Sequence, residues 1–200
     1  MNDIDKLTEY FKEFPGIGPR QAKRFVYFLL RKNARYTNEL AELIPRVRKQ
    51  VVTCPDCFRY YVPQGTQTNC AICSASDRQP STLMIVARDT DLEAVEKSDT
   101  YEGNYFVLGG TLPVLEDDIQ KYIRLRELEA LIAKRQTAGL RELIIALNAN
   151  PDGDNTARFL KQKLTPLGLI ISILGRGLST GSELEYADSD TIKNALKNRA

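Results

Sequence analysis

The sequence of 200 residues contains no histidine, only four cysteines and no long apolar run. The absence of histidine removes the commonest general base of enzymes, and a zinc site built on the cysteines therefore has to be a Cys₄ site. No apolar stretch approaches the ~20 residues that a membrane-spanning helix needs. The N-terminus is charged and lacks the apolar segment of an export signal. We therefore expect a cytoplasmic protein that does not bind membranes.

The four cysteines form two pairs, Cys54-Pro-Asp-Cys57 and Cys70-Ala-Ile-Cys73, with twelve residues between them. Two C-x-x-C pairs at this separation let four thiolates converge on one tetrahedral ion, the geometry that Zn²⁺ prefers. The alternatives are two disulfides, which a reducing cytosol disfavours, or a redox-active pair, which does not explain the second pair. The spacing therefore predicts one structural Zn²⁺ per chain, with residues 58–65 forming a hairpin that returns the second pair to the first.

Basic residues are concentrated in the first quarter of the chain. Residues 1–52 carry 11 Lys and Arg against 6 Asp and Glu, whereas the remaining residues carry 17 against 20. Six basic residues and no acid lie between Phe14 and Asn38. A localised positive patch of this kind indicates a polyanionic partner, although a basic helix face is also a common solvated surface.

The periodicity of apolar residues divides the chain into a helical part and an α/β part. Three amphipathic helices are predicted in the first 52 residues, with Pro19 as the first residue of the second and Thr37 as the N-cap of the third. A short strand at 184–186 and a helix capped by Asp188 or Ser189 are expected at the end. Between these segments, strands are predicted at 83–87, 105–108, 143–147 and 170–174, with helices starting at Asp89 and spanning 116–135 and 153–163. This alternation predicts a mostly parallel sheet covered by helices.

The turn between the first two helices has the pattern of a phosphate-binding hairpin. Gly16 and Gly18 leave the backbone N–H groups bare of side chains, and the helix start that follows presents unpaired amides. Arg20, Lys23 and Arg24 follow within two turns. The pattern predicts that these five residues bind the sugar–phosphate backbone of DNA without reading bases. A role in helix packing or subunit contact is the alternative, and both roles can hold together.

Two aspartates follow the predicted strand at 143–147. Asp152 and Asp154 form a D-x-D at the carboxyl end of a parallel strand, where such sheets place their sites, and carboxylates there can hold Mg²⁺. A phosphoryl-transfer site needs a third acid, but the first strand ends in Ala87. Capping of a helix and a turn is the competing interpretation of these aspartates.

Two glycine-rich segments remain. The run 108–111 lacks the lysine and the helix start of a P-loop and is interpreted as a tight turn. The segment 175–177 is interpreted as a turn that places Arg176 at the domain edge, for contact with DNA or with another subunit.

Taken in order, these motifs resemble those of the bacterial RecR family of recombination mediators, over nearly the whole chain. The resemblance rests on the Phe-Pro-Gly-Ile-Gly-Pro-Arg hairpin at 14–20, the two cysteine pairs, the Tyr-Phe-Val-Leu-Gly-Gly-Thr-Leu run at 105–112 and the segments 175–178 and 181–188. It implies four parts: a helix-hairpin-helix domain at 1–53, a Cys₄ zinc finger at 54–79, a Toprim-type α/β domain at 80–176 and a C-terminal segment at 177–200.

The resemblance also implies a function. Members of the family form ring-like tetramers that clamp single- and double-stranded DNA independently of sequence. They work with RecO and RecF to load the recombinase RecA at single-stranded gaps. The role is non-enzymatic, and a nucleoid-associated location follows from it.

Three departures from the family pattern concern the acidic centre. Ala87 replaces a glutamate, Asp152 and Asp154 stand in a shortened segment where the family has glutamates, and Phe106 replaces a histidine. These changes argue against a Mg²⁺-dependent role and affect the same acidic loop that would bind a partner, so Asp152 and Asp154 are candidates for either a Mg²⁺ site or a partner site. A Mg²⁺-dependent Toprim nuclease or nucleotidyl transferase remains the enzymatic alternative, and a pure assembly protein is a third hypothesis.

Overall fold

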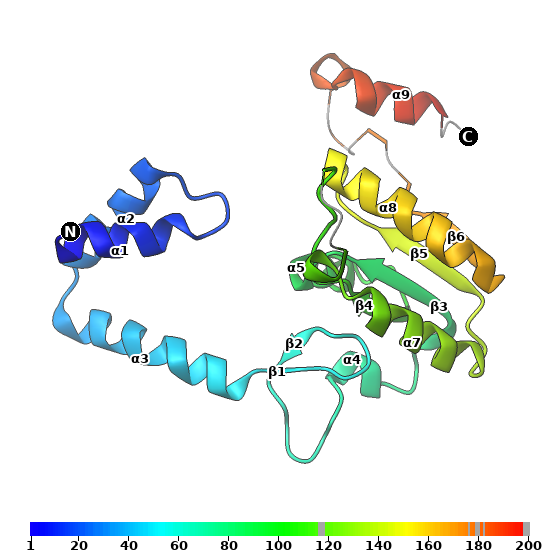
Figure 1. The fold of residues 1–200 in the computed structure, drawn as a ribbon, viewed down its shortest axis with the longest axis horizontal. Coiled ribbons are helices and arrows are strands. Elements are labelled where there is room, and N and C mark those ends of the chain that lie inside the picture. Colours follow the sequence, from blue (N-terminus) through cyan, green and yellow to red (C-terminus); the bar gives the residue numbers. More distant parts are fainter. Residues whose placement is uncertain (116–118, 176, 179–180, 182, 198–200) are drawn as a thin grey trace. The chain divides into compact units, whose positions relative to one another are not determined.

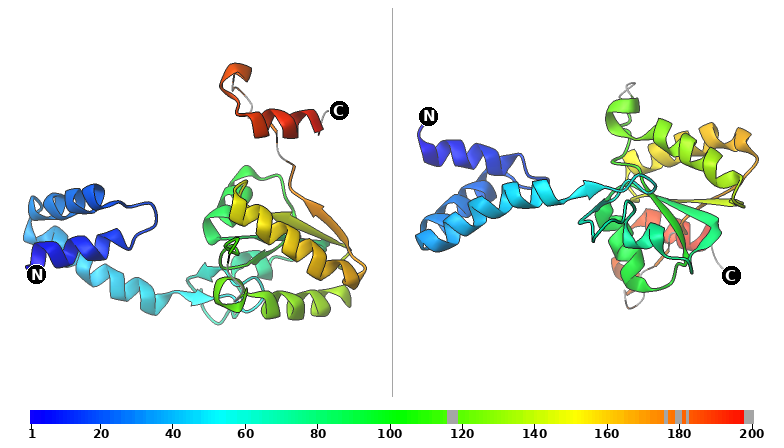
Figure 2. Two further views of the ribbon diagram at one scale, coloured as in Figure 1. Left: turned by 45° about the horizontal axis from the view of Figure 1, so that its top comes forward. Right: turned by 90° about the horizontal axis from the view of Figure 1, so that it is seen from below.

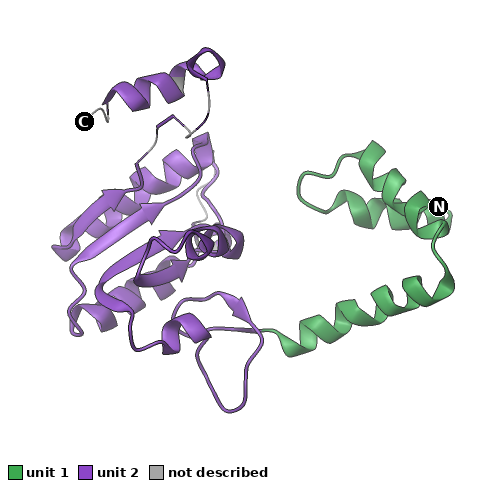
Figure 3. Ribbon diagram, turned by 180° about the vertical axis from the view of Figure 1, so that it is seen from behind, with its two compact units in different colours: residues 1–51 green, residues 52–200 purple. Residues whose placement is uncertain are grey.

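The computed structural model describes residues 1–115, 119–175, 177–178, 181 and 183–197. The chain divides into two compact units, residues 1–51 and residues 52–200 (Figure 3). The division into four parts expected from the family resemblance is finer than this and stays a prediction.

The first unit contains three helices, α1 (Asp3–Lys12), α2 (Pro19–Leu30) and α3 (Ala34–Gln50) (Figure 1). Pro19 is the first residue of α2, as predicted, and the buried Ala22 and Val26 lie on this helix. The prediction for the start of the third helix was wrong. Asn33, not Thr37, is the N-cap, because the Asn33 side chain accepts a 2.9 Å hydrogen bond from the amide of Tyr36.

The second unit is built on a four-stranded parallel sheet with the strand order β4-β3-β5-β6. These strands are β3 (Gln79–Val86), β4 (Gly103–Val107), β5 (Glu142–Ala146) and β6 (Ile170–Ile173). Their helical connections are α5 (Asp89–Ser98), α6 (Ile119–Tyr122), α7 (Leu125–Gln136), α8 (Pro151–Leu164) and the 3₁₀ turn η1 (Thr165–Leu167). The parallel α/β architecture expected from the strand–helix alternation is confirmed (Figure 2).

Alternating residues of the strands face two separate cores. Leu83 and Ile85 of β3 pack on one side with Phe106 and with apolar residues of α7 and α8. Met84 and Val86 face the other side, where they pack with Leu92 of α5 and with the buried cysteines. Because side chains alternate along a strand, α7 and α8 cover one face of the sheet, and α5 together with the buried cysteines covers the other.

The cysteine module consists of β1 (Val52–Thr53), β2 (Tyr60–Tyr61) and α4 (Ala71–Ser74). The predicted hairpin within 58–65 is not where the strands pair. Instead, β1 pairs antiparallel with β2, so that the hairpin encloses the first cysteine pair.

Two further expectations require correction. The helix predicted at 116–135 is broken into α6 and α7 at the buried Ile123 and at Arg124, and its first three residues lie outside the described residues. The strand predicted at 184–186 is a 3₁₀ turn, η2 (Leu184–Tyr186), with exposed side chains and no strand paired to it among the described residues. The final helix is α9 (Ser189–Lys197), and Asp188 caps it by accepting from the amide of Thr191 at 2.8 Å.

Candidate metal centre and nucleic-acid interface

The four cysteine sulfur atoms converge, with all of them within 4.8 Å of one another. The Sγ atoms of Cys57 and Cys70 are 3.6 Å apart. A tetrahedral metal with metal–sulfur bonds of about 2.3 Å separates its sulfur ligands by about 3.8 Å, so the group fits such an ion. Cys54, Cys57 and Cys70 are buried, and Cys73 is partly buried. The predicted gathering of the four thiols into one potential metal site is confirmed.

Local hydrogen bonds shape the first cysteine turn. The amide of Cys54 donates to the carbonyl of Arg59 at 2.9 Å, and the amide of Phe58 donates to the carbonyl of Cys54 at 3.0 Å. Phe58 has a φ of +61°, which is uncommon for a residue with a side chain and closes the turn. The amide of Cys70 also donates to the sulfur of Cys54 at 3.5 Å, a contact that favours the thiolate form.

The four cysteine thiols strongly shift one another's pKa. Hydrogen bonding with Cys57 and then Cys70 lowers the pKa of Cys54, whereas hydrogen bonding with Cys54 raises the pKa of both Cys57 and Cys73. Metal binding must therefore displace protons from the thiols whose pKa is raised. Because ligands bind a metal as thiolates, occupation of the site is expected to weaken in acid.

The cysteine module is joined to the α/β part by hydrogen bonds and an ion pair. The carbonyl of Cys57 accepts from the amide of Val107 at 2.8 Å. The carboxylate of Asp56 contacts Lys134 of α7 at 2.9 Å, and the amide of Tyr60 donates to Asp89 of α5 at 2.7 Å. The module is therefore fixed to three elements of the α/β part.

Arg124 is the central connection between these parts, and sequence reasoning missed it. Its guanidinium donates to the carbonyl of Val107 at 2.9 Å and to the carbonyl of Phe58 at 3.3 Å, and it stacks over the Phe58 ring. Gly109, at a φ of +95°, lies against the guanidinium, so that an added Cβ would be 3.3 Å from it. No sequence signal marked this arginine, because it lay inside an apparently continuous helix.

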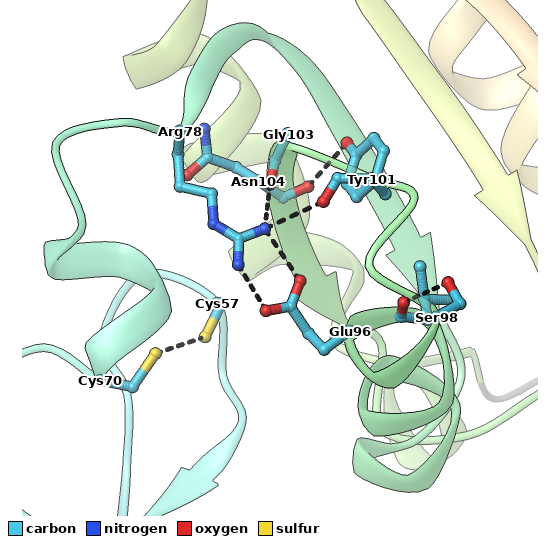
Figure 4. Close-up of polar contacts among 9 residues, drawn as sticks. Cys57, Cys70, Arg78, Glu96, Ser98, Tyr101, Gly103 and Asn104 are labelled. Carbon is cyan, nitrogen blue, oxygen red and sulfur yellow. Dashed lines mark hydrogen bonds and ion pairs between the residues drawn. The ribbon is translucent and has the colours of Figure 1, made fainter.

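Close to the metal centre, Arg78 and Glu96 form a half-buried ion pair that sequence reasoning also missed (Figure 4). Both guanidinium NH groups of Arg78 contact the Glu96 carboxylate, and one of them also reaches the carbonyls of Tyr101 and Gly103. Burial is the largest single influence and raises the pKa of Glu96, but the hydrogen bonds and charge of Arg78, with smaller contributions from Tyr105 and Arg59, together hold this pKa below its ordinary value. The pair ties the start of β3 to α5.

The hairpin in the first unit has the backbone that a phosphate site needs. Gly16 has a φ of +76°, and Gly18 is the N-cap of α2 without a side chain to cap the helix. An added Cβ at either glycine would meet nothing within 4 Å, so the backbone is open to a ligand. The first amides of α2 therefore lack a side-chain acceptor and can receive an anion.

The predicted basic residues lie beside this helix start. Arg20, Lys23 and Arg24 are all exposed, and Arg24 donates only to the nearby Gln21 at 3.4 Å. Within residues 1–51, which are all described, the ion pairs are Lys12–Glu9 and Arg46–Glu42. The three cations are thus available to a polyanion, and DNA binding by them stays a prediction.

The two predicted aspartates lie in the first turn of α8, where the helix dipole favours carboxylates. Asn150 caps this helix by accepting from the amide of Gly153 at 2.8 Å. The hydroxyl of Thr156 accepts from the amide of Leu112, which fixes the turn to the segment after β4. Asp152 and Asp154 therefore stand where acids commonly stabilise a helix end.

The carboxyl end of the first strand supplies no third acid to this turn. Ala87 is fully buried there. Asp89 accepts from the amide of Tyr60, and Asp91 accepts from the amide of Arg88. Among the described residues, the four cysteines are the only group of three or more ligand side chains close enough to share a metal ion. The arrangement therefore favours helix capping over a Mg²⁺ site.

Comparison with known proteins covers the whole chain. Family models match the RecR helix-hairpin-helix at residues 4–47, the Toprim domain at 81–175 and the RecR C-terminal region at 177–200. The chain is 36% identical over 197 residues to the recombination protein RecR of Jannaschia, covering 98% of this chain and 96% of that protein. It is 32% identical over 203 residues to the RecR of Bdellovibrio bacteriovorus, covering 100% and 97%.

The chain belongs to the RecR family. The family resemblance expected from the hairpin and the cysteine pairs is thereby confirmed. In this RecR protein the Toprim match coincides with the parallel sheet, and the helix-hairpin-helix match lies within the first unit. Across the described part of the chain, none of the helices combines the length and apolar character needed to cross a membrane.

Proposed function

We propose that this RecR protein is a non-enzymatic DNA-binding mediator of recombination in DNA repair. The observation that carries the proposal is the hairpin between α1 and α2. It combines an open helix start with the exposed Arg20, Lys23 and Arg24. Such a site binds phosphates through backbone amides and charge, so affinity depends on salt and not on base sequence.

The metal of the cysteine site is one structural Zn²⁺ per chain. Four thiolates form a tetrahedral set of soft ligands, which suits Zn²⁺ and leaves no position open for a substrate. The geometry of the sulfur atoms and their burial support this assignment. The metal stabilises the turn that packs on β4 and takes no part in a reaction.

The active assembly is a ring-like homotetramer that encloses single- or double-stranded DNA at the nucleoid. It acts with RecO and RecF to load RecA at single-stranded gaps. Membership of the RecR family supports this assembly and these partners. Asp152 and the exposed Asp154 form the acidic turn that docks a basic partner surface.

A Mg²⁺-dependent reaction is not part of the proposal. Two-metal phosphoryl transfer requires a cluster of acids, whereas Ala87 occupies the end of the first strand. Asp89 and Asp91 are engaged by backbone amides. These contacts support a non-enzymatic use of the Toprim fold.

The test is binding to a labelled duplex that carries a single-stranded gap, titrated across salt with Mg²⁺ present. The triple variant Arg20→Ala/Lys23→Ala/Arg24→Ala should weaken binding and reduce the slope of log K against log salt by about 3. Arg46→Ala/Arg48→Ala/Lys49→Ala removes the same charge from the end of α3 and serves as the control. Unchanged binding by the hairpin variant would refute the assignment.

Each sample is then run on a denaturing gel. We expect intact strands. Strand cleavage that requires Mg²⁺ and disappears in Asp152→Asn would replace the proposal by a Toprim nuclease. If the protein forms normal oligomers that do not bind DNA even when the partners are present, the hypothesis of a pure assembly protein would be favoured.

A further inference from the structure

The C-terminal end of α2 and the start of α3 carry exposed aromatic rings around one lysine. The rings of Phe28 and Tyr36 lie 6.3 Å apart between centroids at an angle of 84°. The ammonium of Lys32 stands 4.6 Å from the Phe28 centroid and 5.3 Å from that of Tyr36. Phe28 is 48% exposed and Tyr36 is 41% exposed, so both rings retain open surface.

The charge around these rings is mainly positive, and the nearest acid along the chain is Glu39, one turn after Tyr36 on α3. Arg31 and Arg35 flank Lys32, all three are exposed, and none of them forms an ion pair within residues 1–51. No acidic residue occurs between Phe14 and Asn38. The surface therefore combines partly exposed rings with cations that form no ion pair, which is a combination that binds single-stranded nucleic acid.

We propose that Phe28, Lys32 and Tyr36 form a stacking platform for unpaired bases of single-stranded DNA, with Arg31 and Arg35 binding its phosphates. Bases in a duplex are stacked on one another and leave no face for the rings, whereas a single strand offers both faces and backbone. The inference deepens the proposed function, on which it rests, by naming where the single strand lies.

The platform is separate from the hairpin that holds phosphates. Gly18, the N-cap of α2, and Phe28 are ten residues apart, which corresponds to about 15 Å at the rise of an α-helix. One end of α2 therefore contacts a sugar–phosphate backbone and the other end contacts bases. This arrangement suits a junction between duplex and single strand.

A second copy of the chain is the competing occupant of these apolar rings. In a two-fold contact the same patch meets itself, so Arg31, Lys32 and Arg35 would face their own copies, and the single neighbouring acid, Glu39, does not balance three cations. Charge complementarity therefore favours a polyanion over a second copy.

The experiment compares three probes with the full-length protein at one low salt concentration: oligothymidylate, an abasic strand of the same length, and a duplex. The abasic strand keeps the phosphates and lacks the bases. Phe28→Leu/Tyr36→Leu should lose roughly tenfold in affinity for oligothymidylate and less than twofold for the other two probes. Tyr10→Leu/Tyr60→Leu, which removes two rings that are 56% and 55% exposed, should leave all three affinities unchanged.

A second measurement keeps the test decisive if the double variant unfolds. The chain contains no tryptophan, so Tyr36→Trp introduces a single tryptophan at the platform, which can be excited separately from the remaining tyrosines. Its emission should be quenched by oligothymidylate and not by the abasic strand. Tyr60→Trp, outside the platform, should respond to neither.

Equal losses on all three probes, no loss on oligothymidylate, or a changed oligomeric state at constant affinity would each overturn the platform. Failure of the platform can be told apart from failure of the proposed function. If the wild-type protein binds no probe even at low salt, both proposals fall. If it binds the abasic strand as tightly as oligothymidylate while the hairpin variant still weakens binding, only the platform falls.

Discussion

The amide of Val107 donates a 2.8 Å hydrogen bond to the carbonyl of Cys57, which makes the first cysteine turn a continuation of the parallel sheet. Val107 is the last residue of β4, an outer strand of that sheet. An outer strand exposes unpaired backbone groups that can pair with a strand of another molecule. The cysteine turn covers part of this edge of β4.

Loss of the metal should therefore weaken β4 as well as the cysteine module. Cys57→Ser should reduce the bound metal from one ion per chain to almost none and lower the melting temperature by at least about 10 °C. Metal content by mass spectrometry and calorimetry check this, with Ser76→Ala as the control. A variant that loses the metal and keeps its melting temperature would contradict the role.

Arg124→Leu should destabilise the second unit by about 2 kcal/mol, because it leaves the carbonyls of Phe58 and Val107 without their charged donor. The free energy of unfolding in denaturant measures the effect. Arg141→Leu changes an exposed arginine and should have little effect. Equal stability of the two variants would show that the guanidinium is dispensable.

The Arg78–Glu96 pair should make stability depend on pH in the acid range. The Glu96 pKa in the folded state lies below its ordinary value of 4.5, so the unfolded chain binds the proton first as the pH falls. The contribution of the pair is complete above pH 4.5 and disappears as the pH falls through the folded pKa.

This dependence is measured by comparing wild type with Glu96→Gln in denaturant titrations from neutral pH downwards. Glu96→Gln should be less stable by about 1.5 kcal/mol at neutral pH, and the difference should shrink below pH 4.5. Glu93→Gln, at an exposed position of the same helix, provides the control. A difference that stays constant into acid would exclude the ion pair as its source.

Gly153→Ala should destabilise the protein by about 3 kcal/mol, since a Cβ there would stand 2.0 Å from the carbonyl oxygen of Asn148 and force the backbone to move. Gly175→Ala meets nothing within 4 Å and should be nearly neutral. The stability of both variants is compared with that of the wild type by thermal unfolding. A stable Gly153→Ala protein would mean that the acidic turn of α8 adapts easily.

Features fixed by short-range rules could be predicted from the sequence. The cysteine cluster follows from spacing alone, because four soft ligands in two close pairs have few other uses. The parallel sheet follows from the alternation of strand and helix patterns. The start of α2 follows from Pro19, whose ring fixes φ and whose missing amide proton suits a first helical position.

Features that depend on partners distant in sequence could not be predicted. Asn33 and Thr37 are both acceptable N-caps, and the short connection after α2 selects Asn33. The break before α7 is held by Arg124, whose partners lie on β4 and in the cysteine module. The segment 184–186 has a strand-like sequence, but a strand requires a paired neighbour, and the described residues provide none.

The thin core of the first unit has a consequence for the protein's internal motions. In residues 1–51 only Ala22 and Val26 are fully buried, whereas α1 and α3 contain no buried residue. A unit with so little buried apolar surface should open far more often than the sheet, and its amide protons should exchange with solvent first. DNA bound to α2 should therefore slow amide exchange in residues 1–51 and leave the amide exchange of β3 and β5 unaltered.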